Sequence, residues 1–327
     1  MQARLAIVIV NFRTPGVTVD CLRTLAAEVA ANQGVRAVVV ENGSGDASAV
    51  QLREAIERHG WQEWCDLVVS DRNWGFSGGN NRGYERVMET GGAEYILLLN
   101  SDTLVDPGCV RFCLDVMDRD TGVGALSCRL LNRDGTVQNT CRKFPTPLRC
   151  LAATFSLPWR LPRLFSWADC DDEGWDRNRT ARDVEWIGGA FMMLRGPWVE
   201  KHGLLDERFF FYGEDIEICH RVWRSGLRCR YEPGATVTHL GGASSDPSRM
   251  AAGKRNIHSW RGRYLVQRYC YGAWAEWLLR VQDLCNVGLR VLWGRLRRRT
   301  ALPAHAAMVE ELRVLRTNWS TWSKPVG

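Results

Sequence analysis

Long apolar runs are missing from this sequence, since no stretch approaches the ~20 apolar residues that a helix needs to cross a membrane. The first apolar run, residues 5–10, is also too short for a secretory signal peptide. The 12 cysteines include no CxxC pair, and the spacing of Cys109 and Cys113 suits neither a zinc ribbon nor a redox dithiol. We therefore expect a cytoplasmic protein whose cysteines are reduced and mostly buried.

A broad excess of charge is missing too. The formal net charge is +6, but residues 290–299 alone hold five arginines and no acid, so most of the excess is local. This distribution argues against a nucleic-acid partner and favours one basic patch. With 327 residues, 45% of them hydrophobic, the chain can form one large domain or two smaller ones.

What the first half does contain is a regular alternation of two patterns. Short apolar runs predict strands at residues 4–10, 35–40, 67–70 and 95–99. Helical spacing of apolar residues lies between them, for example in residues 79–90. Such alternation predicts parallel strands with right-handed crossovers. Residues 1–125 therefore read as the nucleotide-binding half of a doubly wound, mostly parallel, Rossmann-like α/β sheet.

The second half is less regular. A turn around Asn132 and Gly135 predicts a hairpin, and the glycine-broken run 186–194 predicts a strand. A helix is expected at 214–225, a last strand at 231–239 and one long helix at 264–293. We expect residues 126–250 to complete the first domain as its acceptor half, and residues 251–327 to form a helical C-terminal region.

Polar side chains end several of the predicted strands. Asn11 ends the first, Glu41 the second, and Asn100 and Asp102 follow the fourth. The carboxyl ends of parallel strands form the crevice where α/β sheets bind ligands. A carboxylate with a nearby amide there suits a hard divalent cation that bridges nucleotide phosphates. The alternative is a plain polar turn after a strand, since Asn and Asp are common in turns.

A glycine- and asparagine-rich segment, residues 73–83, precedes the predicted helix at 79–90. Its backbone N–H groups can approach a substrate closely, although it lacks the GxxxxGK[ST] pattern of an ATPase loop. The alternative is a glycine-rich turn.

Three aromatic residues and a Tyr-Gly step precede Glu214 and Asp215 at the start of a predicted helix. A hydrophobic rim of this kind raises the pKa of a carboxylate by desolvation and makes it a usable base. The alternative is that these acids only complement the helix dipole, and both roles are compatible.

These motifs occur in an order that resembles the family 2 glycosyltransferases with a GT-A fold, particularly the rhamnosyltransferase-like branch. The resemblance covers residues 4–245, and it includes the Asn-x-Gly-Phe-x-Gly-Gly-Asn-Asn, Leu-Leu-Asn-x-Asp and Phe-Phe-x-Tyr-Gly-Glu-Asp motifs. The family implies an inverting, metal-dependent hexosyltransferase that takes a sugar from a nucleoside-diphosphate donor with Mg²⁺ or Mn²⁺.

The resemblance also implies roles for individual residues. Asp102 matches a metal-binding aspartate, Asp215 the catalytic base, and His239 and Arg221 lie where the family often has groups near the metal or the diphosphate. Trp186 and Glu214 are expected acceptor contacts. The expected donor-nucleotide contacts are Asn11, Glu41, Asn42, Asn73, Gly75, Gly78, Gly79 and Asn100.

Three residues allow more than one interpretation. Asn100 stands where the family usually has the first Asp of Asp-x-Asp, which leaves fewer charged metal ligands. Glu41 stands where Asp is more usual, which shifts the expected ribose or base contact. His239 can equally be a structural histidine.

The donor and the acceptor are inferred less directly. The rhamnosyltransferase-like motifs favour dTDP-L-rhamnose, with UDP-hexoses next. Tryptophans and arginines in residues 264–299 and 142–167 suggest a peripheral contact with an anionic membrane surface. A lipid-linked saccharide at the cytoplasmic face of a bacterial membrane, used for cell-surface polysaccharide, is then the expected acceptor. The alternative for these segments is packing on protein.

Two rival functions fit the sequence less well. A sugar nucleotidyltransferase usually has a glycine-rich loop with Arg and Lys directly after the first strand, where this chain has residues 11–15, Asn-Phe-Arg-Thr-Pro. A non-catalytic sugar- or membrane-binding module predicts loss of Asp102 or Asp215, and both are present.

Overall fold

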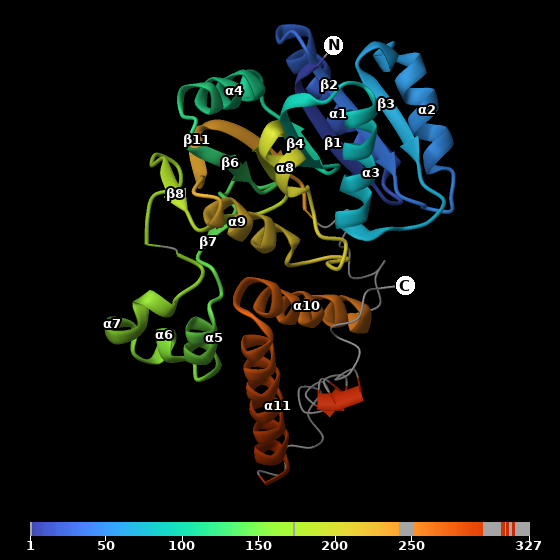
Figure 1. The fold of residues 1–327 in the computed structure, drawn as a ribbon. Coiled ribbons are helices and arrows are strands. Elements are labelled where there is room, and N and C mark those ends of the chain that lie inside the picture. Colours follow the sequence, from blue (N-terminus) through green and yellow to red (C-terminus); the bar gives the residue numbers. More distant parts are fainter. Residues whose placement is uncertain are drawn as a thin grey trace.

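The computed structural model describes residues 2–172, 174–241, 252–296 and three pairs, 309–310, 312–313 and 316–317. Most of the described strands join one mixed sheet with the order β3-β2-β1-β4-β10-β6-β11-β5, and β8 pairs with β11 (Figure 1). The first half comprises β1 (Ala3–Asn11), α1 (Pro15–Ala31), β2 (Val35–Glu41), α2 (Ser48–Arg58), β3 (Cys65–Val69), α3 (Gly75–Glu89), β4 (Ala93–Asn100), β5 (Thr103–Val105), α4 (Cys109–Arg119) and β6 (Val123–Leu131).

The N-terminal part of the sheet is the predicted parallel unit. β1 pairs in parallel with both β2 and β4, and β2 pairs in parallel with β3. The register sets Asn11 opposite Glu41, and Val10 opposite Asn100. The polar strand ends therefore lie side by side, as the sequence predicts.

The second half completes the same sheet instead of forming another. It comprises β7 (Cys141–Arg142), α5 (Pro147–Thr154), α6 (Leu157–Arg160), α7 (Pro162–Phe165), β8 (Arg182–Val184), β9 (Trp186–Ile187), β10 (Phe191–Arg195), α8 (Gly196–His202), α9 (Glu214–Arg224) and β11 (Arg228–His239). β10 lies antiparallel between β4 and β6, and β11 runs parallel to β6. β7 and β9 form a separate small sheet.

Two apolar cores cover the two faces of the sheet. On one face, α1, α2 and α4 contribute residues such as Leu22, Leu52 and Val110. On the other, α3, α8 and α9 contribute residues such as Val87, Val199 and Ile218. This is the doubly wound arrangement that the alternation predicts, and eight of the twelve cysteines are buried.

The glycine-rich segment differs from its prediction, because it is helical. α3 begins at Gly75 instead of residue 79. The glycines serve close packing: a Cβ on Gly83 would lie 2.3 Å from a methyl group of Val8, and one on Gly79 would lie 2.9 Å from Val10. The absence of side chains at these positions lets the helix approach β1.

Two other elements are interrupted where one was predicted. The run at 186–194 splits at Gly188 and Gly189 into β9 and β10, which belong to different sheets. The helix at 264–293 is broken at Gly272, whose φ is +105°. It becomes the end of α10 (Ala252–Val266), a π-helical turn η3 (Gln267–Tyr271) and α11 (Ala273–Leu296). The predicted hairpin keeps its turn, but its second strand shrinks to one bridge between Leu131 and Val137.

The helices α10 and α11 lie at one end of the molecule, beside α5–α7 (Figure 1). Gln282 of α11 donates to the carbonyl of Cys150 in α5, which ties the two segments together. The expected domain boundary at residue 250 falls outside the described residues. In the part of the chain that the structure describes, no helix has both the length and the hydropathy to cross a bilayer.

Candidate active site

Asp102 and His239 lie together at the carboxyl edge of the sheet. Asp102 follows β4 and is buried, and its Oδ1 lies 3.2 Å from Nε2 of His239 at the end of β11. The side-chain nitrogen of Asn100 also lies 3.2 Å from that Nε2. The structure therefore brings together the three residues that the sequence suggests for the metal-binding end of the site.

Gln138 orients the imidazole of His239. Its Oε1 lies 2.9 Å from Nδ1 of His239, and its Nε2 donates to Asn132 and to the carbonyl of His239. An amide oxygen can only accept, so Nδ1 donates its proton to Gln138. In the neutral imidazole the lone pair is then on Nε2, which lies 3.2 Å from both Asp102 Oδ1 and the side-chain nitrogen of Asn100. Metal-binding histidines are held in this way by an acceptor on their second nitrogen.

A carboxylate oxygen and an imidazole lone pair in this arrangement fit a divalent cation. No cluster of three or more His, Cys, Asp or Glu side chains able to hold a metal occurs among the described residues. A cation at Asp102 and His239 would therefore take further ligands from substrate phosphates and water, which is the usual way in which Mg²⁺ binds.

Glu214 and Asp215 begin α9. Burial raises the pKa of Asp215 to about 6, against the opposing effect of backbone N–H groups and of Arg142. Burial, and after it the charge of Asp215, also raises the pKa of Glu214, whose Oε2 is buried without a hydrogen-bond partner in the described structure. A carboxylate with a pKa near neutrality is ionised in solution at pH 7 and still basic enough to accept a proton.

The loop between β9 and β10 connects Asp215 to Asp102 and His239. A Cβ on Gly189 would lie 4.0 Å from the Cβ of Asp215. The next residue, Ala190, accepts a hydrogen bond of 3.0 Å from the backbone N–H of Asn100. Asp215 and Asp102 are therefore held on either side of one short backbone segment.

The aromatic segment before α9 holds the start of that helix against α3. The N–H of Phe76 donates to the carbonyl of Phe210 at 2.8 Å, and the rings of Phe76 and Phe211 meet edge to face. A Cβ on Gly75, whose φ is +73°, would lie 2.2 Å from that same carbonyl oxygen. Position 75 thus requires glycine for two reasons: the carbonyl of Phe210 lies too close for a side chain, and the positive φ disfavours any other residue.

The predicted nucleotide contacts are only partly available to a ligand. The amide of Asn42 is used within the protein: it donates to Asn73 and to the carbonyl of Gly75, and it accepts from the N–H of Trp74. Glu41 accepts from the N–H of Ser44. Asn11 differs, because its side-chain nitrogen is buried and has no partner among the described residues. Asn42 and Asn73 thus shape the edge, while Asn11 keeps an unused donor there.

Arg221 is not brought to these residues. Its guanidinium binds Glu217 and the backbone carbonyls of His202, Gly203 and Leu204, so its donors tie α9 to the end of α8. Trp186 lies on β9, where its indole N–H donates to the carbonyl of Lys143.

Sequence reasoning missed Gln138 and Arg142. Gln138 is separated from His239 by 101 positions, and no local pattern marks it. Arg142 is the first residue of the segment 142–167, and its charge acts on Asp215.

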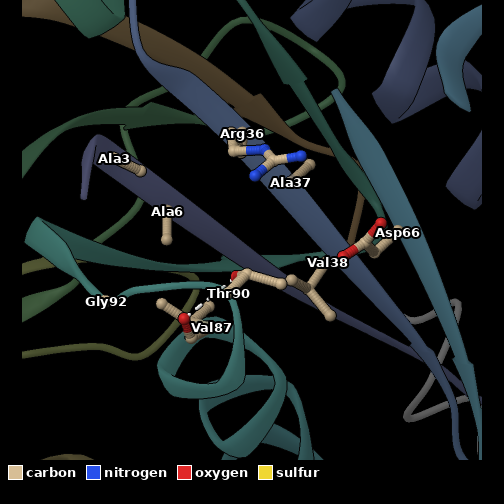
Figure 2. Close-up of a pocket in the computed structure, with 9 residues that line it drawn as sticks. All are labelled: Ala3, Ala6, Arg36, Ala37, Val38, Asp66, Val87, Thr90 and Gly92. Atoms are coloured by element: carbon tan, nitrogen blue, oxygen red, sulfur yellow. Dashed lines mark hydrogen bonds between the residues drawn. The ribbon is translucent and has the colours of Figure 1, made fainter. Parts of the chain in front are cut away.

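Two cavities lie away from this edge of the sheet. A void of about 10 Å³ lies among Ala3, Ala6, Val87 and Gly92, near the opposite ends of the strands (Figure 2). It has room for no more than about one water molecule. A larger cavity of about 360 Å³ is lined by residues of α5, α10 and α11. Neither is lined by Asp102, His239 or Asp215.

The sheet order and the polar carboxyl edge define a GT-A-like α/β fold. Among solved structures, the chain is similar to a mannosyltransferase from Pyrobaculum calidifontis in complex with GDP-Man and Mn²⁺, with a TM-score of 0.55, 12% identity and coverage of 99% of this chain and 88% of that one. At this identity the likeness shows the fold alone.

Sequence comparisons give the family. The family model for glycosyl transferase family 2 matches residues 6–168. A low-salt glycan biosynthesis hexosyltransferase of Haloferax volcanii is 28% identical over 228 residues, which are 68% of this chain and 62% of that protein. An N-acetylglucosaminyl-diphospho-decaprenol L-rhamnosyltransferase of Mycobacterium tuberculosis is 26% identical over 267 residues, 77% of this chain and 82% of that protein. The chain belongs to glycosyl transferase family 2 and is rhamnosyltransferase-like.

Proposed function

We propose that this chain is an inverting, metal-dependent glycosyltransferase that moves a sugar from a nucleoside-diphosphate donor to a hydroxyl group of a saccharide acceptor. The observation that carries the proposal is that two carboxylates in different surroundings, Asp102 and Asp215, lie at the same edge of the sheet. Oδ1 of Asp102 lies 3.2 Å from Nε2 of His239, and Asp215, whose pKa is raised, lies beside Gly189.

Asp102 and His239 would hold Mg²⁺ or Mn²⁺, which supplies charge neutralisation for the leaving diphosphate when it is bound. Asn11, at the end of β1 on the same edge, would contact the nucleotide through its buried side-chain nitrogen, which has no partner among the described residues. Asn42 and Asn73 keep the neighbouring turn in shape.

Asp215 accepts the proton of the acceptor hydroxyl. The hydroxyl oxygen then bonds to the anomeric carbon, and the bond between that carbon and the diphosphate oxygen breaks, so the diphosphate leaves with the electron pair. Attack opposite the leaving group inverts the anomeric carbon. Glu214, next to the base and with one unpaired oxygen, and Trp186 are the proposed acceptor contacts.

The finer assignment is L-rhamnose from dTDP-L-rhamnose, with a lipid-linked saccharide as acceptor. It is supported by the similarity to a rhamnosyltransferase whose name includes a diphospho-decaprenol acceptor. The reaction would then take place at the cytoplasmic face of the cell membrane, in the synthesis of cell-surface polysaccharide.

The test is release of nucleoside diphosphate from a panel of donors, with Mn²⁺, Mg²⁺ or EDTA. We expect one donor to turn over only with metal, and Asp102→Ala to abolish that turnover. Asp106→Asn is the matched control, because Asp106 is an exposed acid four positions away. Donor binding is measured in parallel by calorimetry, because absence of the acceptor can suppress turnover. Absence of both turnover and metal-dependent donor binding would refute the proposal.

A further inference from the structure

Helix α11 is oriented with its apolar side outward. Trp274 is 62% exposed and Trp277 is 61% exposed, and Leu289 and Leu292 lie on the same side of the helix. The buried side instead includes Glu276, Arg280, Gln282 and Asp283 among its smaller apolar residues. An amphipathic helix that packs on a protein in water has the opposite arrangement.

Buried polar contacts hold the helix in this orientation. Glu276 binds Arg280 one turn along and Arg268 of the preceding π-helical turn. Asp283 accepts from the hydroxyl of Tyr264 and lies 3.5 Å from Arg263. Rotating α11 to bury its tryptophans would break these contacts. The packing of the fold therefore holds the apolar side of α11 toward solvent.

The segment α5–α7 adds a second set of outward apolar side chains. Trp159 is 85% exposed, and Phe155, Leu164 and Trp167 are exposed around it. This segment lies beside α11 at the same end of the molecule (Figure 1), and Gln282 joins the two. Together they form what we call the apolar end: the exposed apolar residues of α11 and of residues 147–168, which contain α5–α7.

The exposed charged residues in the two segments that form the apolar end are basic. Residues 143–168 contain no acid, and Arg160 and Arg163 are exposed there. In α11 both acids are buried, whereas Arg290 and Arg295 are exposed. Two copies of this surface would oppose like charges, whereas the headgroups of an anionic bilayer complement it.

We propose that the apolar end binds the surface of an anionic bilayer, with its tryptophans in the interface and its arginines at the headgroups. Trp, Leu and Arg in this combination are typical of helices that lie in the plane of a membrane. The inference goes beyond the transfer reaction, because it concerns lipid and requires neither donor nor acceptor. It would also deliver the site to an acceptor that is anchored in lipid.

The experiment measures binding of the full chain to vesicles of pure phosphatidylcholine and to vesicles that include phosphatidylglycerol. We expect binding to the anionic vesicles to be much stronger. Arg290→Gln with Arg295→Gln should weaken it about 30-fold, from the usual contribution of a basic residue near an anionic surface. The same charge change at Arg23 and Arg111, exposed residues of α1 and α4, should leave binding unchanged.

Trp274→Ser with Trp277→Ser tests the apolar part and should weaken vesicle binding about tenfold or more. The variants are compared with the wild type in circular dichroism and in transfer to a lipid-free acceptor, both of which should be unchanged. Two results would overturn the inference: no preference of the wild type for anionic vesicles, or a dimer in sedimentation equilibrium that the tryptophan substitutions dissociate. If the wild type binds anionic vesicles but transfers no sugar to any acceptor, the result counts against the proposed function and not against membrane binding.

Discussion

Gln138→Leu tests whether the amide of Gln138 prepares His239 for a cation. The hydrogen bond between Oε1 of Gln138 and Nδ1 of His239 is 2.9 Å long, and it favours the neutral tautomer with its proton on Nδ1 and its lone pair on Nε2, the nitrogen beside Asp102. Loss of such an outer partner typically lowers metal affinity by about 10–100-fold. In free energy this is about 1.4–2.7 kcal/mol.

The assay is diphosphate release or donor binding titrated with Mn²⁺. We expect the half-saturating Mn²⁺ concentration to rise by about 10–100-fold, with turnover at saturating metal close to that of the wild type. A double-mutant cycle with His239→Ala supplies the control, because Gln138→Leu should have little further effect on metal dependence once the imidazole is gone. An unchanged half-saturating concentration in the single variant, or an equal effect in both backgrounds, would refute the reasoning.

Three further outcomes are expected. Asp215→Asn should lower transfer by about 10²–10⁴-fold with donor binding retained, and wild-type kcat/KM should rise with pH through about 6 as Asp215 loses its proton; a flat profile across that range counts against Asp215 as the base. Glu214→Gln should stabilise the fold at neutral pH, because the pKa of Glu214 is raised in the fold and the wild type therefore loses stability as pH rises above the ordinary carboxyl pKa. The urea midpoints of the variant and the wild type should converge in acid. A difference between the two midpoints that stays constant with pH contradicts this. Gly83→Ala should cost about 1–3 kcal/mol by overpacking, since its Cβ would lie 2.3 Å from Val8, whereas a Cβ on Gly16 in α1 meets no atom within 4 Å; equal denaturation midpoints for Gly83→Ala and Gly16→Ala would contradict the packing argument.

The parallel half of the fold could be predicted because its strands are buried on both faces. Such strands read as continuous apolar runs, and their polar ends mark the carboxyl edge without any tertiary information. Asn11, Glu41 and Asn100 were found in this way, and the pairing register confirms that they are neighbours.

The orientation of α11 could not be predicted in the same way. Helical spacing shows that Trp274, Trp277 and Leu289 share a side, but not whether that side is buried. The outcome depends on Tyr264 and Arg268, which supply partners for acids on the other side of the helix. Gln138 escaped for a similar reason, because its contact with His239 joins positions that are far apart in the chain.

The central position of β10 has a consequence for synthesis of the protein. β4 and β6 are complete by residue 131, yet the strand that lies between them spans Phe191–Arg195. Until that stretch leaves the ribosome, two apolar strands present unpaired edges, which are templates for association with other chains. A chain truncated before β10 would therefore lack the centre of its sheet as well as Asp215, the proposed base, so premature termination should yield aggregates and no partially active enzyme.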